Sequence, residues 1–198
     1  MKNKDLSNNF ELREFLLSDT AVQLGVESTQ YYPPYDVEEN LEYLAEYTLQ
    51  PARYFLDYGF TINSGWRCKA VNDEVGSTDA SQHLKGEAAD VSISDRMLTT
   101  ERKSTIHAIA ELRRRIKRVT GVMPREDVNA DYYLWAYFCL HLDELDIDQV
   151  IHEYGSDGSP SWVHVSSSDR QDRRRMTIKR KGKRYTDLSL SKALMLGC

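Results

Sequence analysis

The sequence is poor in cysteine and contains no paired arrangement of cysteines. Its three cysteines, Cys68, Cys139 and Cys198, are an odd number at unrelated spacings. Disulfide frameworks and thiolate metal sites require regular pairs of cysteines. We therefore expect all three thiols to be reduced.

Long apolar segments are missing as well. No run of roughly 18 apolar residues, the length of a transmembrane helix, occurs in the chain. The first residues, MKNKDLSNNFEL, lack the apolar segment of a signal peptide. The sequence thus predicts no membrane span and a protein made in the cytoplasm. If its substrate lies outside the membrane, another component has to carry or release it there.

The length and composition favour one folded domain. A chain of 198 residues can close one sizeable hydrophobic core. Hydrophobic residues make up 40% and charged residues 29%, and twelve tyrosines add bulk, so a disordered chain is excluded. We expect a single domain over residues 1–198, with an N-terminal helical lead at 1–36 and a basic C-terminal tail at 168–198.

The net charge of −5 hides an uneven distribution. Acidic residues are concentrated at 36–46 and 143–153, whereas basic residues are concentrated between Arg170 and Arg184. We interpret this basic stretch first as a solvated, charged edge strand. Nucleic acid, lipid headgroups and the anionic polymers of a cell wall are its alternative partners.

The spacing of apolar residues predicts both helices and strands. Helices are expected at 10–17, 37–58, 69–76, 99–119 and 130–142. Strands are expected at 60–67, 86–93, 149–154 and 162–167, followed by a hairpin over 176–188 that turns at Gly182. Pro33 and Pro34 exclude a helix at 30–36, and Pro51 either kinks the long helix or begins a new turn.

Three polar residues have the pattern of metal ligands. His83 lies in the polar loop SQHLKG, and Asp90 lies on the polar face of the strand that follows. In a fully extended chain these two residues would be more than about 20 Å apart, so the loop has to fold back, which Gly86 permits. His164 lies in WVHVSS, between two valines that face the other way.

Two neutral imidazoles and one carboxylate form a three-ligand set that leaves the fourth tetrahedral position of zinc open for water. Zinc lowers the pKa of bound water toward about 7, and a carboxylate such as Glu153 can take the proton during attack on a carbonyl. The alternative is that the histidines are ordinary core residues. We assign His107 and His141 to that class, because they fall on helices without an acidic residue at ligand spacing.

Several segments resemble the zinc D-alanyl-D-alanine carboxypeptidase and L-alanyl-D-glutamate endopeptidase superfamily, in particular its short bacteriophage and prophage forms. The similar segments are FELREFLLSDTA, VEENLEYLAEYTLQPARYFLDYGFTINSGWRCKAVNDEVG, SQHLKGEAADVSI, and DQVIHEY followed by WVHVSS. The signatures SxHxxGxAxD and WVHVS, in this order, are the specific ones. The resemblance implies an α+β fold: a small, mostly antiparallel sheet with the zinc site on one face and helices packed on the other.

The resemblance also implies roles for individual residues. The zinc ligands are His83, Asp90 and His164. Arg67, in SGWRC, corresponds to the arginine that binds a substrate carbonyl or carboxylate and stabilises the developing oxyanion, which a fixed guanidinium does through parallel hydrogen bonds. A surface ion pair is the alternative for Arg67. Ser81 binds the substrate, orients the loop, or is an ordinary polar loop residue. Trp162 lines the substrate cleft or belongs to the core.

The general base is the point at which the sequence departs from the family pattern. Many members have an acidic residue three positions before the last histidine, where this chain has Ser161. In the related hedgehog signalling domain the corresponding glutamate ends the preceding strand, and the segment HEY places Glu153 there. We therefore expect Glu153 to be the base. Asp157 is an alternative, and His152 is a weaker one because its side chain should point to the opposite face.

The implied function is hydrolysis of an amide bond beside a D-residue in the peptidoglycan stem peptide, with Zn²⁺ as cofactor. A phage-like protein of this kind reaches the cell wall as an endolysin released through a holin, or in a virion with virion proteins as partners. The rival hypothesis is a non-catalytic, zinc-containing virion or wall-binding module, which Ser161 favours. Nucleic acid binding through 170–184 is the weakest hypothesis. The choice between D-Ala-D-Ala and L-Ala-D-Glu bonds stays open, because the motifs do not cover 120–145.

Overall fold

A six-stranded mixed sheet forms the centre of the computed structural model, which describes residues 3–168 and 173–198. The strand order is β3-β4-β6-β5-β7-β8, with bounds β3 Thr61–Ser64, β4 Ala88–Ser92, β5 Ile147–Glu153, β6 Trp162–Ser167, β7 Arg175–Lys179 and β8 Thr186–Leu188. Neighbours are antiparallel except for β5 and β7, which are parallel. The predicted α+β class is confirmed, although the sheet is mixed.

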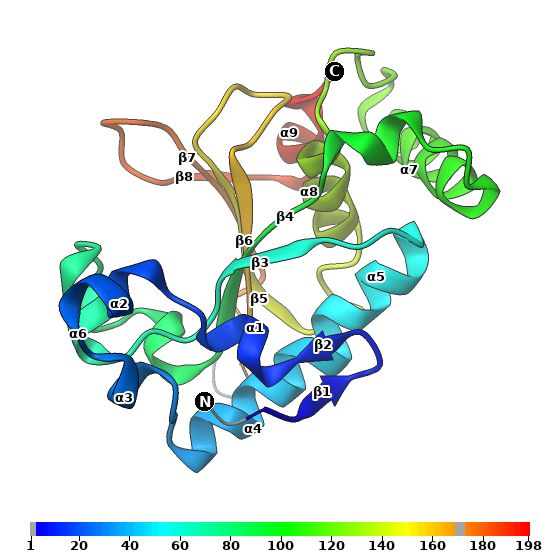
Figure 1. Ribbon diagram of the computed structural model, residues 1–198. Coiled ribbons are helices and arrows are strands. Elements are labelled where there is room, and N and C mark those ends of the chain that lie inside the picture. Colours follow the sequence, from blue (N-terminus) through cyan, green and yellow to red (C-terminus); the bar gives the residue numbers. More distant parts are fainter. Residues whose placement is uncertain (1–2, 169–172) are drawn as a thin grey trace.

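The N-terminal third consists of short elements and one long, interrupted helix (Figure 1). The short elements are β1 Asp5–Ser7, β2 Phe10–Glu11, α1 Leu12–Leu16, α2 Asp19–Leu24 and α3 Glu27–Gln30. The long helix is α4 Tyr35–Tyr43, the π-helical η1 Leu44–Leu49 and α5 Gln50–Leu56. Pro51 has no N–H to donate within the helix, and a wider π turn immediately before it accommodates the proline ring. The helix predicted at 37–58 therefore forms and begins a new turn at Pro51.

The remaining helices are short, apart from two. They are α6 Lys69–Glu74, the 3₁₀ segments η2 Gln82–Lys85 and η3 Asp95–Thr99, α7 Lys103–Thr120, α8 Ala130–Leu140 and α9 Leu190–Met195. The helix predicted at 99–119 begins later, because residues 95–99 form η3 instead. No helix within residues 3–168 and 173–198 combines the length and the apolar character that a membrane span requires.

Helices cover one face of the sheet, and polar residues occupy the other. Helix α8 packs on β5 and β6, and α9 packs on β7 and β8, on the side of the sheet opposite α6 (Figure 1). Trp135 of α8 is fully buried and lies edge-on to the ring of His152, with centroids 5.7 Å apart. Because side chains alternate along a strand, burying His152 and Val150 against α8 turns Gln149 and Glu153 to the opposite face.

The C-terminal basic segment is built into the sheet. Strand β7 pairs with β5 on one side and β8 on the other, so it is an inner strand rather than the predicted edge. The hairpin predicted over 176–188 forms, and Gly182 lies in its turn with a positive φ of 69°. Arg170, part of the basic stretch, lies outside the described residues.

Gly86 ends η2 in a left-handed conformation, with φ of 73°, and a Cβ atom there would lie 2.6 Å from the backbone oxygen of Val37. Gly76 has a φ of 70° but open space around it. Alanine at either position incurs the left-handed cost of about 1 kcal/mol. We expect Gly86→Ala to lower the free energy of unfolding by at least about 1 kcal/mol more than Gly76→Ala, because α4 blocks the added methyl group.

Urea unfolding of the two variants, followed by circular dichroism, measures this difference. Equal losses of stability would show that the loop and α4 separate without cost, contrary to the packing described.

Candidate metal centre

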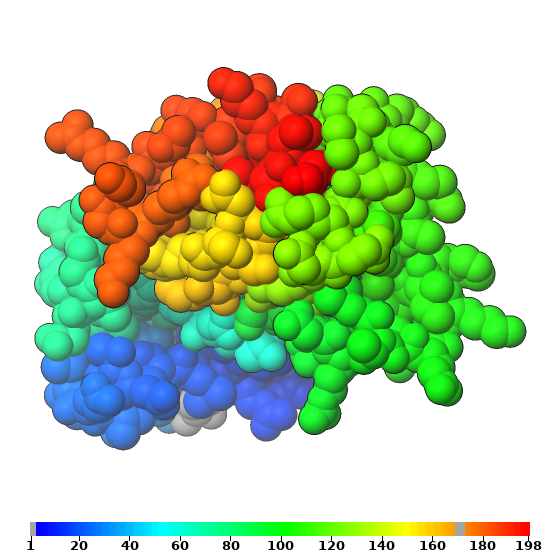
Figure 2. Space-filling view, turned by 90° about the horizontal axis from the view of Figure 1, so that it is seen from above, coloured from blue at the N-terminus to red at the C-terminus, as the bar shows by residue number. Residues whose placement is uncertain are grey.

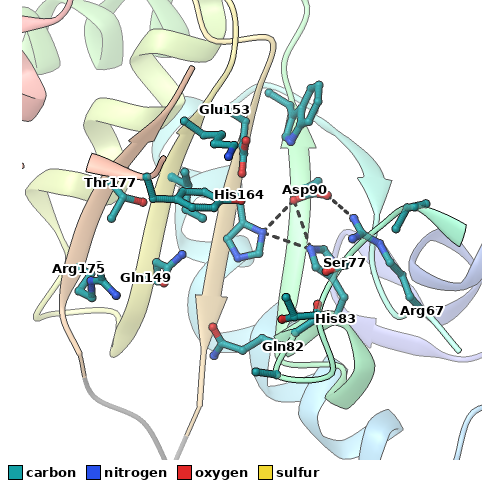
Figure 3. A pocket seen from close by; sticks show the side chains of 18 of the residues that line it. Arg67, Ser77, Gln82, His83, Asp90, Gln149, Glu153, His164, Arg175 and Thr177 are labelled. Carbon is teal, nitrogen blue, oxygen red and sulfur yellow. Dashed lines mark hydrogen bonds and ion pairs between the residues drawn. The ribbon is translucent and has the colours of Figure 1, made fainter. Parts of the chain in front are cut away.

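Three candidate ligands from separate elements converge on the polar face of the sheet. His83 lies in η2, Asp90 in β4 and His164 in β6, and Figure 3 shows their polar ends directed toward one another. Asp90 Oδ1 lies 2.9 Å from His164 Nδ1 and 3.4 Å from His83 Nε2, and the two ring nitrogens are 3.2 Å apart. The structure thus brings together the three residues selected from the sequence.

Strand pairing and a folded loop produce this convergence. Asp90 and His164 are direct partners in the antiparallel pair of β4 and β6, so their side chains stand next to each other on one face. His83 reaches them because the chain reverses at Gly86 immediately after η2. The loop is held from outside the site: Asn40 of α4 donates to the Lys85 carbonyl at 2.8 Å.

The segment that precedes α6 holds the other side of the loop. The Arg67 backbone N–H donates to the His83 carbonyl at 3.1 Å, and Trp66 Nε1 donates to the Leu84 carbonyl at 3.1 Å. The buried Gln30 amide in turn donates to the Trp66 carbonyl and accepts from the Cys68 N–H. Trp66 is therefore a buried scaffold residue.

The donor set fits a divalent cation. The Nδ1 atom of His83 lies 2.6 Å from the Gly65 carbonyl, which can only accept, so Nδ1 bears a proton and Nε2, on the side of Asp90 and His164, is the nitrogen that a cation would bind. Tetrahedral donors about 2.1 Å from one ion are about 3.4 Å apart. The observed separations of 2.9, 3.2 and 3.4 Å are close to that value.

The electrostatics of Asp90 keep it in the form that binds cations. Burial acts to raise the pKa of Asp90, but the two imidazoles beside it outweigh burial and hold that pKa well below its ordinary value. Arg67 Nη2 donates to the second oxygen, Oδ2, at 2.6 Å, and Arg67 Nε donates to Ser64 Oγ at 2.9 Å. This clamp leaves Oδ1 of Asp90 directed at His83 and His164.

Glu153 lies beside this cluster at the end of β5. Its exposed fraction is only 6%, and burial raises its pKa to about 7, against the opposing influence of His164 and Lys179. Figure 3 shows Glu153 next to His164 on the neighbouring strand. Tyr185, from the segment before β8, interacts with Glu153, and its own pKa is raised to about 12, first by burial and then by nearby groups that include this carboxylate.

The two alternative bases lie elsewhere. His152 is fully buried on the helix-covered face, where its Nε2–H donates to the Asp157 carbonyl at 3.0 Å. The Asp157 carboxylate is paired with Arg180 at the surface. Of the three acidic or basic groups considered from the sequence, Glu153 is the one that lines the cleft.

A cleft of about 810 Å³ surrounds the three candidate ligands. One wall is the segment from Val75 to His83, which includes Ser81, and the other is formed by β5, β7 and Tyr185, while Trp162 and Arg67 also line it. Seen from above, the blue-green segment around α6 and the orange hairpin of β7 and β8 lie on the same side of the molecule (Figure 2). Ser81, Trp162 and Arg67, which were selected from the sequence, thus all line this cleft.

A family model described as Peptidase M15 matches residues 8–119, more than half of the chain. The match includes Arg67, His83 and Asp90, whereas Glu153 and His164 lie beyond it. A comparison with curated proteins finds no match.

The C-terminal segment contributes to the site in a way that was not predicted from the sequence. Arg173 Nε donates to both oxygens of Asp148, at 3.0 and 2.9 Å, and Arg173 Nη2 donates to Gln82 Oε1 at 2.8 Å. Asp148 is fully buried, and Gln82 is adjacent to His83. Arg173 therefore ties the segment before β7 to the metal loop. The sequence signal for this contribution is the alternation from 173 to 179. Polar residues stand at every second position, with apolar Met176 and Ile178 among the others, a pattern typical of a strand with one polar face.

Loss of Arg173 should lower the free energy of unfolding far more than loss of an ordinary surface arginine. In Arg173→Met the buried Asp148 carboxylate loses its cation, and we expect the free energy of unfolding to fall by about 3 kcal/mol. In the control Arg180→Met an exposed pair with Asp157 is lost, which should cost about 1 kcal/mol or less. Chemical denaturation of both variants measures the difference, and similar losses would contradict a structural role for Arg173.

Proposed function

Because the chain belongs to the peptidase M15 family, we propose that it is a zinc-dependent peptidase that hydrolyses amide bonds in the stem peptides of bacterial peptidoglycan. The observation that supports this most directly is the convergence of two imidazoles and one carboxylate in a cleft that also contains a buried glutamate. His83, Asp90 and His164 would hold the ion. When bound, zinc supplies a Lewis acid that lowers the pKa of water and polarises a carbonyl.

In this proposal Glu153 is the general base. Its carboxylate accepts a proton from the attacking water and returns it to the leaving amine, and a pKa near 7 suits both transfers. A carboxyl group with a pKa of about 7 is close to half ionised at neutral pH. The alternative of a non-catalytic wall-binding module was based on Ser161, and Glu153 supplies an acidic group in the cleft despite that serine.

Arg67 has two roles in this proposal. It positions Asp90 through the bond from Nη2 to Oδ2. Its remaining Nη1 group makes no hydrogen bond to the described residues, and the side chain lines the cleft, so it can donate to a substrate carbonyl or carboxylate. Ser81 and Trp162, which also line the cleft, would contact the substrate.

The cleft suits a short peptide, since volumes of about 300–1,000 Å³ are typical of pockets that enclose small ligands. We further propose that the protein acts on the cell wall as a lysis enzyme of phage or prophage origin, free or associated with virion proteins. Either the D-Ala-D-Ala or the L-Ala-D-Glu bond is a candidate for cleavage.

Digestion of purified peptidoglycan tests the reaction. We expect the zinc-loaded protein to release new peptide ends, detected by mass spectrometry of muropeptides, and a chelator to abolish this release. Glu153→Gln should retain zinc but lose at least about 100-fold in rate, because general-base catalysis contributes about 100-fold or more.

Metal binding is measured separately by titration and elemental analysis. We expect His83→Ala, Asp90→Asn and His164→Ala each to abolish stoichiometric zinc binding, whereas His107→Ala, on the exposed side of α7, keeps it. Unchanged muropeptides at full zinc occupancy, in wild type and Glu153→Gln alike, would support the non-catalytic module instead.

The pH dependence follows from the base. Burial raises the pKa of Glu153 to about 7, and a base acts only when deprotonated, so kcat/KM should rise with pH and be lost as pH falls through that pKa. A bound dication moves this midpoint below about 7, because positive charge favours the carboxylate. This loss of activity at low pH should be absent from the residual activity of Glu153→Gln. Zinc occupancy measured over the same pH range distinguishes protonation of Glu153 from protonation of the metal ligands. A loss of activity that follows the loss of zinc would contradict the assignment.

A further inference from the structure

The cleft face of the sheet is a regular grid of side chains set by strand register. One row contains Asp90, His164, Ile151 and Thr177, on β4, β6, β5 and β7. The next row contains Ala88, Ser166, Gln149 and Arg175 on the same strands. The row on the other side contains Trp162, Glu153 and Lys179. The β7 end of the grid therefore presents two cations with a hydroxyl between them.

Arg175 is the cation on this wall that is easiest to redirect. Its partner is Asp187, which is 65% exposed, and an exposed ion pair contributes about 1 kcal/mol or less. Lys179 instead donates to the Lys183 carbonyl at 2.8 Å and lies over the Tyr185 ring. Arg173 is committed to the buried Asp148.

Two buried polar groups on the cleft lining have unused hydrogen-bonding capacity. Thr177 is 1% exposed, and its Oγ1 has no hydrogen-bond partner among the described residues. Gln82 uses its oxygen for Arg173, while its Nε2 has no partner among them either. Unsatisfied buried donors are costly and uncommon in folded proteins. Both groups line the cleft, and Figure 3 shows Thr177, Gln149 and Arg175 clustered on its β7 side.

We propose that Arg175, with Gln149 and Thr177, forms a subsite that binds a second carboxylate of an acidic peptide substrate, away from the scissile bond. The proposal rests on the function proposed above and specifies its substrate. A guanidinium pairs with a carboxylate through two parallel hydrogen bonds. Amide and hydroxyl groups donate further hydrogen bonds to the carboxylate oxygens. An amidated residue offers neither the charge nor the second acceptor oxygen.

The geometry also indicates where this carboxylate lies in the substrate. Strands β6 and β7 are separated by β5, so two spacings of about 4.8 Å place Thr177 and Arg175 about 10 Å from the strand of His164. An extended peptide advances about 3.3 Å per residue. The recognised carboxylate therefore lies within about three residues of the scissile bond. Apart from the carboxylate of its C-terminus, a stem peptide has free carboxylates on the D-glutamyl residue and on a diaminopimelyl residue at the third position.

Binding of synthetic stem peptides tests the subsite without requiring turnover. Two pairs are titrated calorimetrically into zinc-loaded Glu153→Gln protein: D-glutamyl against D-isoglutaminyl, and meso-diaminopimelyl against lysyl at the third position. The pair that the protein discriminates identifies the source of the carboxylate. We expect Arg175→Gln to weaken binding of the acidic member of that pair about tenfold and to leave the neutral member unchanged. Arg175→Lys should restore part of the loss.

Two further variants separate binding from folding. Arg180→Gln removes an arginine from the same hairpin outside the cleft and should leave all affinities unchanged. Thr177→Val should weaken binding of the acidic peptide without lowering stability, because the hydroxyl has no partner in the described chain.

Equal affinity for both members of each pair, equal loss of both in Arg175→Gln, or no binding of any peptide would overturn the proposal. Discrimination that persists in a wild-type protein unable to cleave peptidoglycan would refute the peptidase and leave the subsite. Cleavage of peptidoglycan without discrimination between the peptides of either pair would support the peptidase and refute the subsite.

Discussion

The pairing of β4 with β6 is the constraint on which the site depends. It places Asp90 directly opposite His164, two residues separated by 74 positions in the sequence. A slip of one residue in this register would turn one of the two donors toward the helices. The register is fixed by the opposite face, where Val163 and Val165 are fully buried. The hydrophobic core therefore determines the spacing of the candidate ligands from the opposite face of the sheet.

Local patterns in the sequence were sufficient to predict the two strands of this pairing and the loop that carries His83. Alternation in GEAADVSI and WVHVSS identified both strands and the faces of Asp90 and His164, and Gly86 marked the reversal that brings His83 back. The order of strands was not available from such patterns, because periodicity reports which residues share a face and not which strand lies alongside. The parallel insertion of β7 between β5 and β8 depends instead on contacts distant in sequence. The burial of Asp148 beneath Arg173 is one of them.

The same limitation explains why the basic stretch was interpreted as a solvated strand. A run of arginines appears as free charge when only neighbouring residues are considered. In the fold, Arg173 meets Asp148, Arg175 meets Asp187 and Arg180 meets Asp157. These carboxylates neutralise much of the segment, which weakens any argument for a polyanion partner based on the charge run alone. Their unequal burial also ranks the arginines, from a fixed structural cation at Arg173 to an easily redirected one at Arg175.

The C-terminal hairpin adjoins the proposed base through the pairing of β7 with β5. Glu153 and Lys179 are register partners in the parallel pair of β5 and β7. Burial raises the pKa of Glu153, and the positive charge of Lys179 is among the influences that lower it again. A glutamate buried without such cations would stay protonated at neutral pH, whereas one fully exposed would be too weak a base. The hairpin, which lies outside residues 8–119, thus shapes the wall of the cleft and moderates the proposed base at the same time.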